Sequence, residues 1–372
     1  MERFDVAVVG AGAAGSAAAR SVAERDRSCV VLERFEPGHA EGSSHGSARI
    51  FRLAYHHPDY VRMALRALEA WRDLETASGT KLLTVTGGID IGPRADEAAA
   101  ALEAAGVDHA WLSAEEVSER WPALEPPSER VLFQADAGVC AADLALENLL
   151  RLAREAGAEL RANTEVETIV PDTDGAEIRT SEGTLHADAV VVAAGGWNGP
   201  LLARSGIRLP LTVTLEQVLY LERTDAAPMP TVIEWATPAR YALADPRSNV
   251  LKAGEHHARR VVAAEDRRHD VDHGSIQRVT AWIAERFRDA GGNASTETCL
   301  YTNTPDGEFV LDRLGPIVVG SPCSGHGFKF APLIGKILAD MATGTPIALR
   351  LEAFQAGRAW RERHIVDRAF DA

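Results

Sequence analysis

The sequence is poor in cysteine, and the few cysteines that it has are far apart along the chain. None belongs to a Cys-x-x-Cys pair or to another spacing typical of a metal site. A disulfide framework and a structural zinc site are therefore excluded as the basis of the fold, and a reducing compartment is expected. The 372 residues contain four cysteines, Cys29, Cys140, Cys299 and Cys323.

The sequence also lacks long hydrophobic runs and net positive charge. No stretch approaches the roughly 20 apolar residues of a membrane-spanning helix. The first apolar run, residues 6–9, has acidic Glu2 and Asp5 before it, which is not the pattern of a signal peptide. Acidic residues outnumber Lys and Arg by 54 to 39, and the net charge is −15. Because nucleic acids and anionic membranes bind basic surfaces, neither is an expected partner, and we expect a cytoplasmic protein.

The positions of the histidines do not indicate a metal site. His56-His57 and His256-His257 are adjacent pairs, and adjacent side chains point apart in a strand or loop. We therefore expect no metal site.

The pattern of apolar residues predicts an α/β fold. Of the residues, 46% are hydrophobic and 25% are charged, which is typical of a globular chain of one or two domains. Residues 6–9 read as a buried strand, 11–25 as an alanine-rich helix and 29–32 as a second buried strand. A strand, a glycine turn, a helix and a strand within some thirty residues form a βαβ unit. Further along, we expect a loop over 36–47, a helix over 58–78, a strand over 82–91 and a helix over about 327–343.

The turn of this unit carries a dinucleotide-binding motif. The segment Gly10-Ala11-Gly12-Ala13-Ala14-Gly15 matches G-x-G-x-x-G between a strand and a helix. Such glycines let a pyrophosphate approach the helix N-terminus, where free N–H groups favour anions. Glu33 ends the second strand, where a carboxylate can bind ribose hydroxyls and disfavours a 2′-phosphate. The motif therefore predicts NAD or FAD rather than NADP.

Three further segments resemble the monomeric sarcosine oxidase and N-methyltryptophan oxidase family. Residues 42–52, GSSHGSARIFR, resemble the family's G-S-H-H-G-D-T-R-x-x-R stretch, and residues 324–330, SGHGFKF, match its stretch without a change. Residues 299–302, CLYT, match its C-x-Y-T segment. Tyr241 and Lys252 have the spacing of two of its active-site residues, and His256 follows. The resemblance covers essentially the whole chain and is specific for the family but not for the substrate.

The resemblance implies a Rossmann-like FAD domain that is interrupted by a β-rich α+β substrate domain. We predict that residues 1–85, 137–207 and 306–372 form the FAD domain and that residues 86–136 and 208–305 form the substrate domain. The nucleotide-type motifs occur toward both chain ends, with β-rich segments between them. A monomer is expected.

The resemblance also implies covalent FAD, attached by a thioether from Cys299 to the flavin 8α-methyl group. A thiolate can form this bond if nearby positive charge favours the anion. The other three cysteines are interpreted as small core residues. His45 and Arg49 would lie against the flavin, and the helix start after Gly325 would face its pyrimidine edge. The predicted cofactor-binding residues are Gly10, Gly12, Gly15, Glu33, Arg34, Ser43, His45, Arg49, Val166, Gly195, Trp197, Cys299, Gly325, Gly327, Phe328 and Lys329.

The substrate residues follow from the same resemblance. Arg52 and Lys329 would hold a carboxylate, for which a guanidinium fork and an ammonium are suited. Lys252 would activate dioxygen by stabilising superoxide charge. Tyr241 and His256 would line the substrate cavity, with His256 acting either as general base or only as part of the wall.

These residues imply an FAD-dependent oxidase of secondary amino acids. An N-methyl or cyclic amino acid would be oxidised to an imine while dioxygen becomes hydrogen peroxide. The alternatives are a flavin-dependent dehydrogenase or desaturase of a cyclic imino acid in a biosynthetic pathway and a non-enzymatic flavin- or nucleotide-binding module. Val232, at the position of a bulky Met in the sarcosine enzymes, would leave room for a larger substrate. Ser44, Ser47 and Ala48 depart from the family's polar residues near the flavin.

Overall fold

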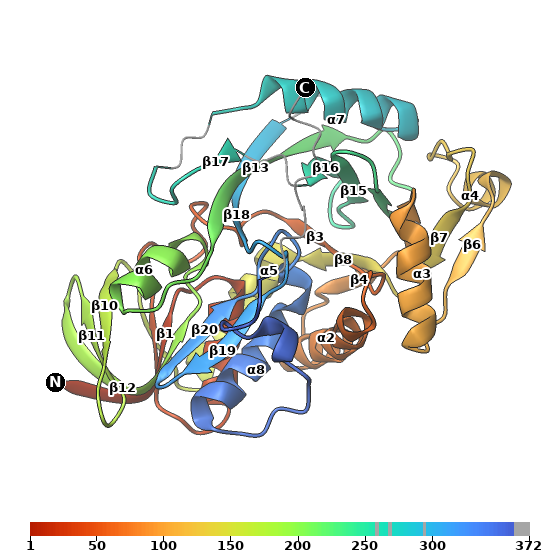
Figure 1. Cartoon of the computed structure of the whole chain (residues 1–372). Helices are drawn as coiled ribbons and strands as arrows, with labels where there is room; N and C mark the ends of the chain where they lie inside the picture. Colours follow the sequence, from red (N-terminus) through yellow and green to blue (C-terminus); the bar gives the residue numbers. More distant parts are fainter. Residues whose placement is uncertain (257–259, 267–269, 293–294, 361–372) are drawn as a thin grey trace.

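The computed structural model describes residues 1–256, 260–266, 270–292 and 295–360 (Figure 1). Its strands form an eight-stranded, a nine-stranded and a three-stranded sheet, with helices around them, which confirms the α/β class. Among the described residues, no helix is both long enough and apolar enough to cross a membrane.

The eight-stranded sheet is built from segments near both ends of the chain. Its order is β10-β11-β12-β1-β2-β9, and β20 pairs with β12 and β19. The centre of the sheet is parallel: β1 pairs with β12 and β2, β12 also pairs with β20, and β2 also pairs with β9. The carboxyl ends of β1, β2, β12 and β20 therefore meet at one edge. The strands are β1 (Glu2–Val9), β2 (Cys29–Leu32), β9 (Glu159–Arg161), β10 (Val166–Pro171), β11 (Ala176–Thr180), β12 (Gly183–Val192), β19 (Val310–Leu314) and β20 (Ile317–Ser321).

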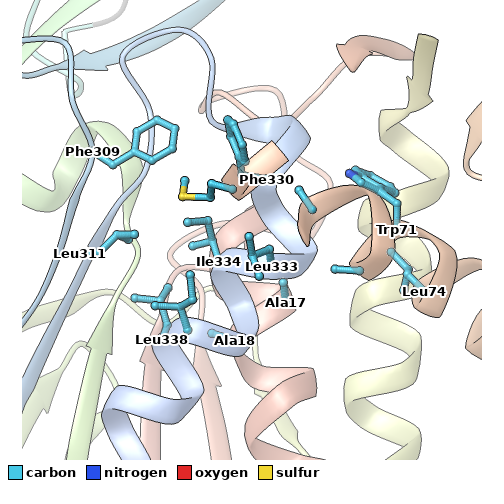
Figure 2. Close-up of a cluster of buried hydrophobic side chains, with 14 of the residues drawn as sticks. Ala17, Ala18, Trp71, Leu74, Phe309, Leu311, Phe330, Leu333, Ile334 and Leu338 are labelled. Carbon is cyan, nitrogen blue, oxygen red and sulfur yellow. The ribbon is translucent and has the colours of Figure 1, made fainter. Parts of the chain in front are cut away.

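The first and last long helices pack on each other beside this sheet. Ala17 and Ala18 of α1 face Leu333, Ile334 and Leu338 of α8 (Figure 2). The helices approach closely because their contact residues are small: a Cβ at Gly335 of α8 would lie 2.3 Å from the carbonyl carbon of Ala17. The helices are α1 (Ala13–Ala23), α2 (Pro58–Ser78), α5 (Ala142–Glu155), α6 (Asn198–Arg204) and α8 (Ala331–Thr343), with the 3-10 turns η1 (Gly195–Trp197), η2 (Phe328–Phe330) and η3 (Glu352–Phe354).

A buried tryptophan ties α2 to the segment before α8. Trp71 is fully buried, and its indole N–H donates to the carbonyl oxygen of Lys329 at 2.7 Å. Figure 2 shows Trp71 and Leu74 on one side of this core, with Phe309, Leu311 and Phe330 around α8. The core therefore fixes the backbone that carries a predicted site residue.

The nine-stranded sheet is built from the middle of the chain. Its order is β17-β13-β16-β15-β14-β5-β7-β6, and β18 pairs with β13. Its strands are β5 (Gly88–Ile91), β6 (Ala110–Leu112), β7 (Val131–Gln134), β13 (Thr212–Glu222), β14 (Thr231–Glu234), β15 (Ala239–Ala244), β16 (Val250–His256), β17 (Arg260–Val261) and β18 (Ser295–Asn303). Its helices are α3 (Arg94–Ala104), α4 (Ala114–Arg120) and α7 (His273–Arg286). The three-stranded sheet has the order β3-β8-β4, with β3 (Ala48–Phe51), β8 (Gly138–Ala141) and β4 (Leu83–Val85).

The two large sheets alternate along the chain. All strands of the eight-stranded sheet fall within the ranges predicted for the FAD domain, and all strands of the nine-stranded sheet fall within those predicted for the substrate domain. The domain bounds themselves stay a prediction, and residues 361–372 of the predicted FAD domain lie outside the described residues.

Local differences from the expected elements have local causes. The β segment expected over 82–91 is two strands, because Gly87 has a φ of +78° and interrupts the extended backbone. The helix expected from Gly327 begins as the 3-10 turn η2, and regular α8 starts only at Ala331. The loop expected over 36–47 ends in β3, a strand that the sequence pattern did not predict.

Candidate active site

A large cavity lies where the carboxyl ends of the parallel strands meet the nine-stranded sheet. Its wall is made by residues within the segments 9–14, 32–52, 193–201 and 320–331 and by residues of β14, β15, β16 and β18. All the predicted site residues except Gly15 line this cavity. The structure therefore brings together residues that are up to 319 positions apart, from Gly10 to Lys329.

The glycine turn forms one end of the cavity. Gly10 has a φ of +97°, and a Cβ there would lie 2.7 Å from the carbonyl oxygen of Ala193. Gly15 has a packing role, because a Cβ on it would lie 1.9 Å from the carbonyl oxygen of Gly10. The hydroxyl of Ser44 accepts a hydrogen bond from the Ala13 N–H at 3.0 Å, so a polar group already meets the first turn of α1.

Glu33 is held in place by backbone donors. One carboxylate oxygen accepts from the Ala11 N–H at 2.7 Å, and the other accepts from the Phe35 N–H at 3.0 Å. Burial raises its pKa, but the hydrogen bonds from His39 and from these two N–H groups outweigh burial and hold the pKa below its ordinary value. A fixed, ionised carboxylate therefore lies beside the glycine turn.

This end of the cavity fits a dinucleotide. Gly12, the second glycine of the motif, lines the cavity, and without a side chain it lets a phosphate approach the backbone there. Trp197 and Ser321 line the cavity, and Nε1 of Trp197 and the hydroxyl oxygen of Ser321 are buried without a hydrogen-bond partner among the described residues. Arg34 lies with its guanidinium carbon 5.9 Å from the Trp197 ring. Val166 and Gly195 line the same region, and Gly195 has a φ of +55°.

A first cluster of positive charge surrounds Cys299. Lys252 on β16 is buried, and its ammonium donates to the carbonyl oxygen of Ala48 at 3.1 Å. Burial and Arg49 lower the pKa of Lys252 to about 7, and Cys299 acts in the opposite direction. Burial holds the pKa of the Cys299 thiol above its ordinary value and outweighs Arg49 and Lys252, which act to lower it. The positive charge that the thioether hypothesis requires is therefore present.

Arg49 and His45 are held by backbone carbonyls. Arg49 donates to the carbonyl oxygens of Ser43 and Ala48 at 3.1 and 2.9 Å and also to that of His45. The ring Nε2 of His45 lies 3.1 Å from the carbonyl oxygen of Thr298. These contacts bind β3 and the loop before it to β18, which carries Cys299.

A second cluster contains Arg52 and Lys329, which the structure brings to the same aromatic ring. The guanidinium carbon of Arg52 lies 4.5 Å from the centroid of Tyr55, and the ammonium of Lys329 lies 5.7 Å from it. Lys329 also donates to the carbonyl oxygen of His326 at 2.8 Å. Burial and the nearby Arg52 charge hold the pKa of Lys329 well below its ordinary value. An anion in this part of the cavity would relieve the repulsion between the two cations.

The sequence analysis missed two residues that hold Arg52. Asp90 is buried, and one of its oxygens lies 3.5 Å from Arg52. The same oxygen accepts from the indole N–H of Trp235 at 2.9 Å, and the Trp235 ring lies 5.2 Å from the Arg52 guanidinium carbon. No motif marks either residue, because β5 and β14 become neighbours only when the sheet forms.

Tyr241 and His256 lie on the wall opposite the glycine-rich segment before α8. Gly325 has a φ of +75°, and a Cβ there would lie 2.7 Å from Cε1 of His256. Tyr301 is also in contact, because its ring centroid lies 5.8 Å from that of His256. A side chain has no room at Gly327 either, since a Cβ there would lie 1.5 Å from the carbonyl oxygen of Pro322. Gly325 therefore lets this segment lie close to His256 and Tyr301 of the nine-stranded sheet, and Gly327 lets it turn tightly past Pro322.

Two expectations are wrong. Val232 does not face the cavity: it is buried in the core of the nine-stranded sheet, and the next residue, Ile233, lines the cavity instead. Ile233 pairs directly with Tyr241, which places both side chains on one face of the sheet. Cys323 is not a core residue, because it is partly exposed and lines the cavity. Its sulfur accepts a hydrogen bond from the Thr302 N–H at 3.2 Å.

Comparisons with known proteins show which sequences the chain is similar to. The model of the family described as FAD dependent oxidoreductase matches residues 5–341. Monomeric sarcosine oxidase from Streptomyces avermitilis is 32% identical over 371 residues, which cover 93% of this chain and 96% of that protein. N-methyl-L-tryptophan oxidase from Salmonella newport is 30% identical over 374 residues, 96% of this chain and 99% of that protein.

A solved structure extends the similarity to the fold. The open form of NikD, an unusual amino acid oxidase essential for nikkomycin biosynthesis, superposes with a TM-score of 0.86 at 28% identity. The match covers 98% of this chain and all of that one.

Proposed function

The chain belongs to the FAD-dependent oxidoreductase family, and from this premise we propose that it is an oxidase of secondary amino acids. An N-methyl or cyclic amino acid would lose two electrons and two hydrogens to become an imine, and dioxygen would become hydrogen peroxide. The observation that carries the proposal is the presence in one cavity of a buried Arg52–Lys329 pair and a separate Arg49–Lys252 pair beside Cys299.

The residues at the glycine turn would hold the cofactor. Gly10, Gly12 and the start of α1 would bind its phosphates, and the fixed carboxylate of Glu33 would bind ribose hydroxyls. FAD, when bound, accepts two electrons from a substrate and passes them to an acceptor. We propose that Cys299 attaches FAD covalently and that Arg49 supplies positive charge beside it.

The Arg52–Lys329 pair would bind the substrate carboxylate. Arg52 is already held between the rings of Tyr55 and Trp235, so little side-chain freedom is lost on binding. Lys329 has a lowered pKa, and a carboxylate beside it would favour its protonated form. Tyr241 and His256 would face the amine side, where the imidazole can accept a proton from a substrate ammonium.

Oxygen uptake with a matched substrate panel tests this proposal. We expect oxygen consumption and hydrogen peroxide with N-methyl or cyclic L-amino acids and much less with primary amino acids. Matched carboxamides of the same compounds should be poor substrates, because they lack the anion. Turnover with an artificial electron acceptor but not with oxygen would instead support the alternative, a dehydrogenase or desaturase of a cyclic imino acid.

The carboxylate site can be tested at Arg52. We expect Arg52→Ala to raise KM for the amino acid by about 10- to 100-fold, because a charged hydrogen bond contributes about 1.5–3 kcal/mol. Discrimination between the acid and its carboxamide should fall by a similar factor. Steady-state kinetics on both compounds measure this change.

Arg94 provides the matched control for this substitution. It also lies against Trp235, with its guanidinium carbon 5.4 Å from the ring, but it is exposed and does not line the cavity. Arg94→Ala should leave both KM values unchanged. Equal oxidation of acid and carboxamide by the wild type would contradict the carboxylate site.

The size of the substrate pocket can be tested at two neighbouring residues. Ile233→Ala should enlarge the cavity and shift the kcat/KM ratio toward bulkier substrates by about tenfold or more, since a single methylene group in an apolar pocket changes this ratio by about 10- to 200-fold. Val232→Ala should leave this ratio unchanged and lower the free energy of unfolding by ~2 kcal/mol, because Val232 is a core residue. Kinetics on an N-alkyl series and thermal denaturation separate the two effects, and the reverse pattern would place Val232 in the pocket.

A further inference from the structure

A second hollow opens on the surface at residues of β13, β16 and β18. It is lined by Ser47, Tyr220, Asp245, Arg247, Ser248, Val250, Ser295 and Glu297. Glu297 lines both this hollow and the large cavity. The surface hollow and the cavity therefore meet at the side chain of Glu297.

Strand pairing places three polar side chains on one face of the nine-stranded sheet. Tyr220 of β13 pairs directly with Lys252 of β16. Two residues before Tyr220, Val218 pairs directly with Glu297 of β18. Paired residues share a face, and so do residues two apart on a strand. Lys252, Tyr220 and Glu297 therefore form a row across the sheet.

The row leads from solvent to the cavity. The phenol of Tyr220 donates to a carboxylate oxygen of Glu297 at 2.7 Å. The ammonium of Lys252 lies 5.4 Å from the Tyr220 ring centroid. A Cβ at Gly46 would lie 3.2 Å from the Tyr220 oxygen and 3.4 Å from the Lys252 nitrogen, so both atoms border the same small space. Glu297 is exposed, Tyr220 is half-buried and Lys252 is buried.

The proposed oxidase reaction needs a proton on this side of the cavity. Reduction of dioxygen to hydrogen peroxide consumes two electrons and two protons. A hydride taken from the substrate carries two electrons and one proton, so one further proton must reach dioxygen. Lys252 is buried and can supply it repeatedly only if it is reprotonated from solvent.

We propose that Glu297 and Tyr220 form a proton relay from the surface hollow to Lys252, an inference that rests on the proposed oxidase function. Glu297 takes up a proton from solvent, and its hydrogen bond with Tyr220 reverses: the carboxyl group gives its proton to the phenol oxygen while the phenol hydrogen passes to the Lys252 amine. The resulting ammonium gives a proton to reduced oxygen and returns to the amine. Each catalytic turnover moves one proton and returns the three side chains to their starting protonation states.

The charges around the relay suit this role. Burial and the hydrogen bond to Glu297 raise the pKa of Tyr220, so the phenol stays neutral and can donate and accept at once. Of the groups that face Lys252, Arg49 on β3 lowers its pKa, whereas Cys299 and Glu297 on β18 and Asp245 raise it. With burial, the balance gives a pKa of about 7, so both the ammonium and the amine are accessible near neutral pH.

Direct reoxidation by oxygen tests the relay without a substrate. The holoenzyme is reduced with dithionite in the absence of air and mixed with oxygenated buffer. We expect Glu297→Gln and Tyr220→Phe each to slow reoxidation by about 10²-fold, the lower end of the range for loss of a proton-transfer group. Reduction of the enzyme by an amino acid should stay unchanged. Asp143→Asn is the control, since this carboxylate pairs with Arg247 at the hollow but is not in the row.

Small acids distinguish a relay from a structural role. In Glu297→Ala, formate or imidazole buffer can enter the surface hollow and should restore fast reoxidation. In Tyr220→Phe, whose inner link is missing, the same buffers should restore little. Rescue of this kind does not occur when a residue only supports the fold.

A titration provides a readout that does not depend on turnover. The sequence contains four lysines, so carbon-13 labelling of lysine gives four signals, and the one lost in Lys252→Met belongs to Lys252. Its pKa should fall in Glu297→Gln, because Glu297 raises it. An unchanged pKa would show that Glu297 does not face Lys252 and would overturn the relay.

The outcomes separate the two proposals. If the reduced wild type reacts with oxygen no faster than free flavin, the oxidase proposal fails and the relay fails with it. If the wild type reacts fast and both variants match it, the relay alone is wrong. Slow variants that no small acid restores would mean an electrostatic or structural role, which also overturns the relay. Slow reoxidation, rescue and a lowered Lys252 pKa together support it.

Discussion

Cys299→Ser should release all of the flavin on acid precipitation, whereas wild-type protein should keep its yellow colour in the pellet. The reason is that the thiol of Cys299 lines the cavity and that Arg49 and Lys252 both favour its thiolate. A thiolate is the form that reacts with an electrophile, and serine cannot replace it. The absorbance of pellet and supernatant and the mass of the denatured chain measure attachment.

Cys323→Ser is the matched control, because Cys323 lines the same cavity. Its sulfur accepts a backbone hydrogen bond from Thr302, and this variant should keep the flavin attached. Loss of attachment in Cys323→Ser alone would move the bond to that cysteine. Release from the wild type would show that FAD is bound without a covalent bond, and amine oxidation could still occur.

Lys252→Met should slow reoxidation of the reduced enzyme by about 10²–10³-fold, the effect of removing one well-placed group that stabilises developing negative charge. Reduction by substrate should change little, because negative charge on oxygen develops only in the second half of the cycle. Stopped-flow absorbance follows each half separately. Equal effects on both halves would remove Lys252 from this role.

The second cavity lysine should behave in the opposite way. Lys329→Met should slow reduction by the amino acid and leave reoxidation nearly unchanged, because Lys329 lies with Arg52 rather than with Arg49.

The pH dependence of reoxidation gives a further check on Lys252. Lys252 has a pKa of about 7 and is charged below it, so wild-type reoxidation should fall as the pH rises through this value. Lys252→Met should lose that dependence.

Local patterns in the sequence were sufficient for many of the elements. The strand at 29–32 and the helix at 58–78 were predicted with the bounds that β2 and α2 have. Residues next to α2 set both of its ends: the His57 side chain accepts a hydrogen bond from the Asp59 N–H at the start, and Gly79 ends the helix with a φ of +67°. Such signals act within a few residues, so the sequence alone contains them.

Sequence motifs identified many residues of the candidate site, as local patterns identified many of the helices and strands. The glycine turn, the stretches 42–52 and 324–330 and Cys299 all came from the sequence, and the structure places them on one cavity. Their roles remain proposals. A motif can identify these residues because the glycines that shape the backbone and the charged side chains lie within one short stretch of sequence.

Only the tertiary structure decided which side chains face the cavity and what lies behind them. Val232 and Ile233 are adjacent and similar, and the pairing of β14 with β15 and β5 determines that Ile233 faces the cavity. Tyr220 meets Lys252 and Glu297 because β13 pairs with both β16 and β18. A shift of one residue in any of these pairings would turn every side chain of the strand to the other face. Such register depends on contacts between segments far apart in the chain, which no local pattern of residues records.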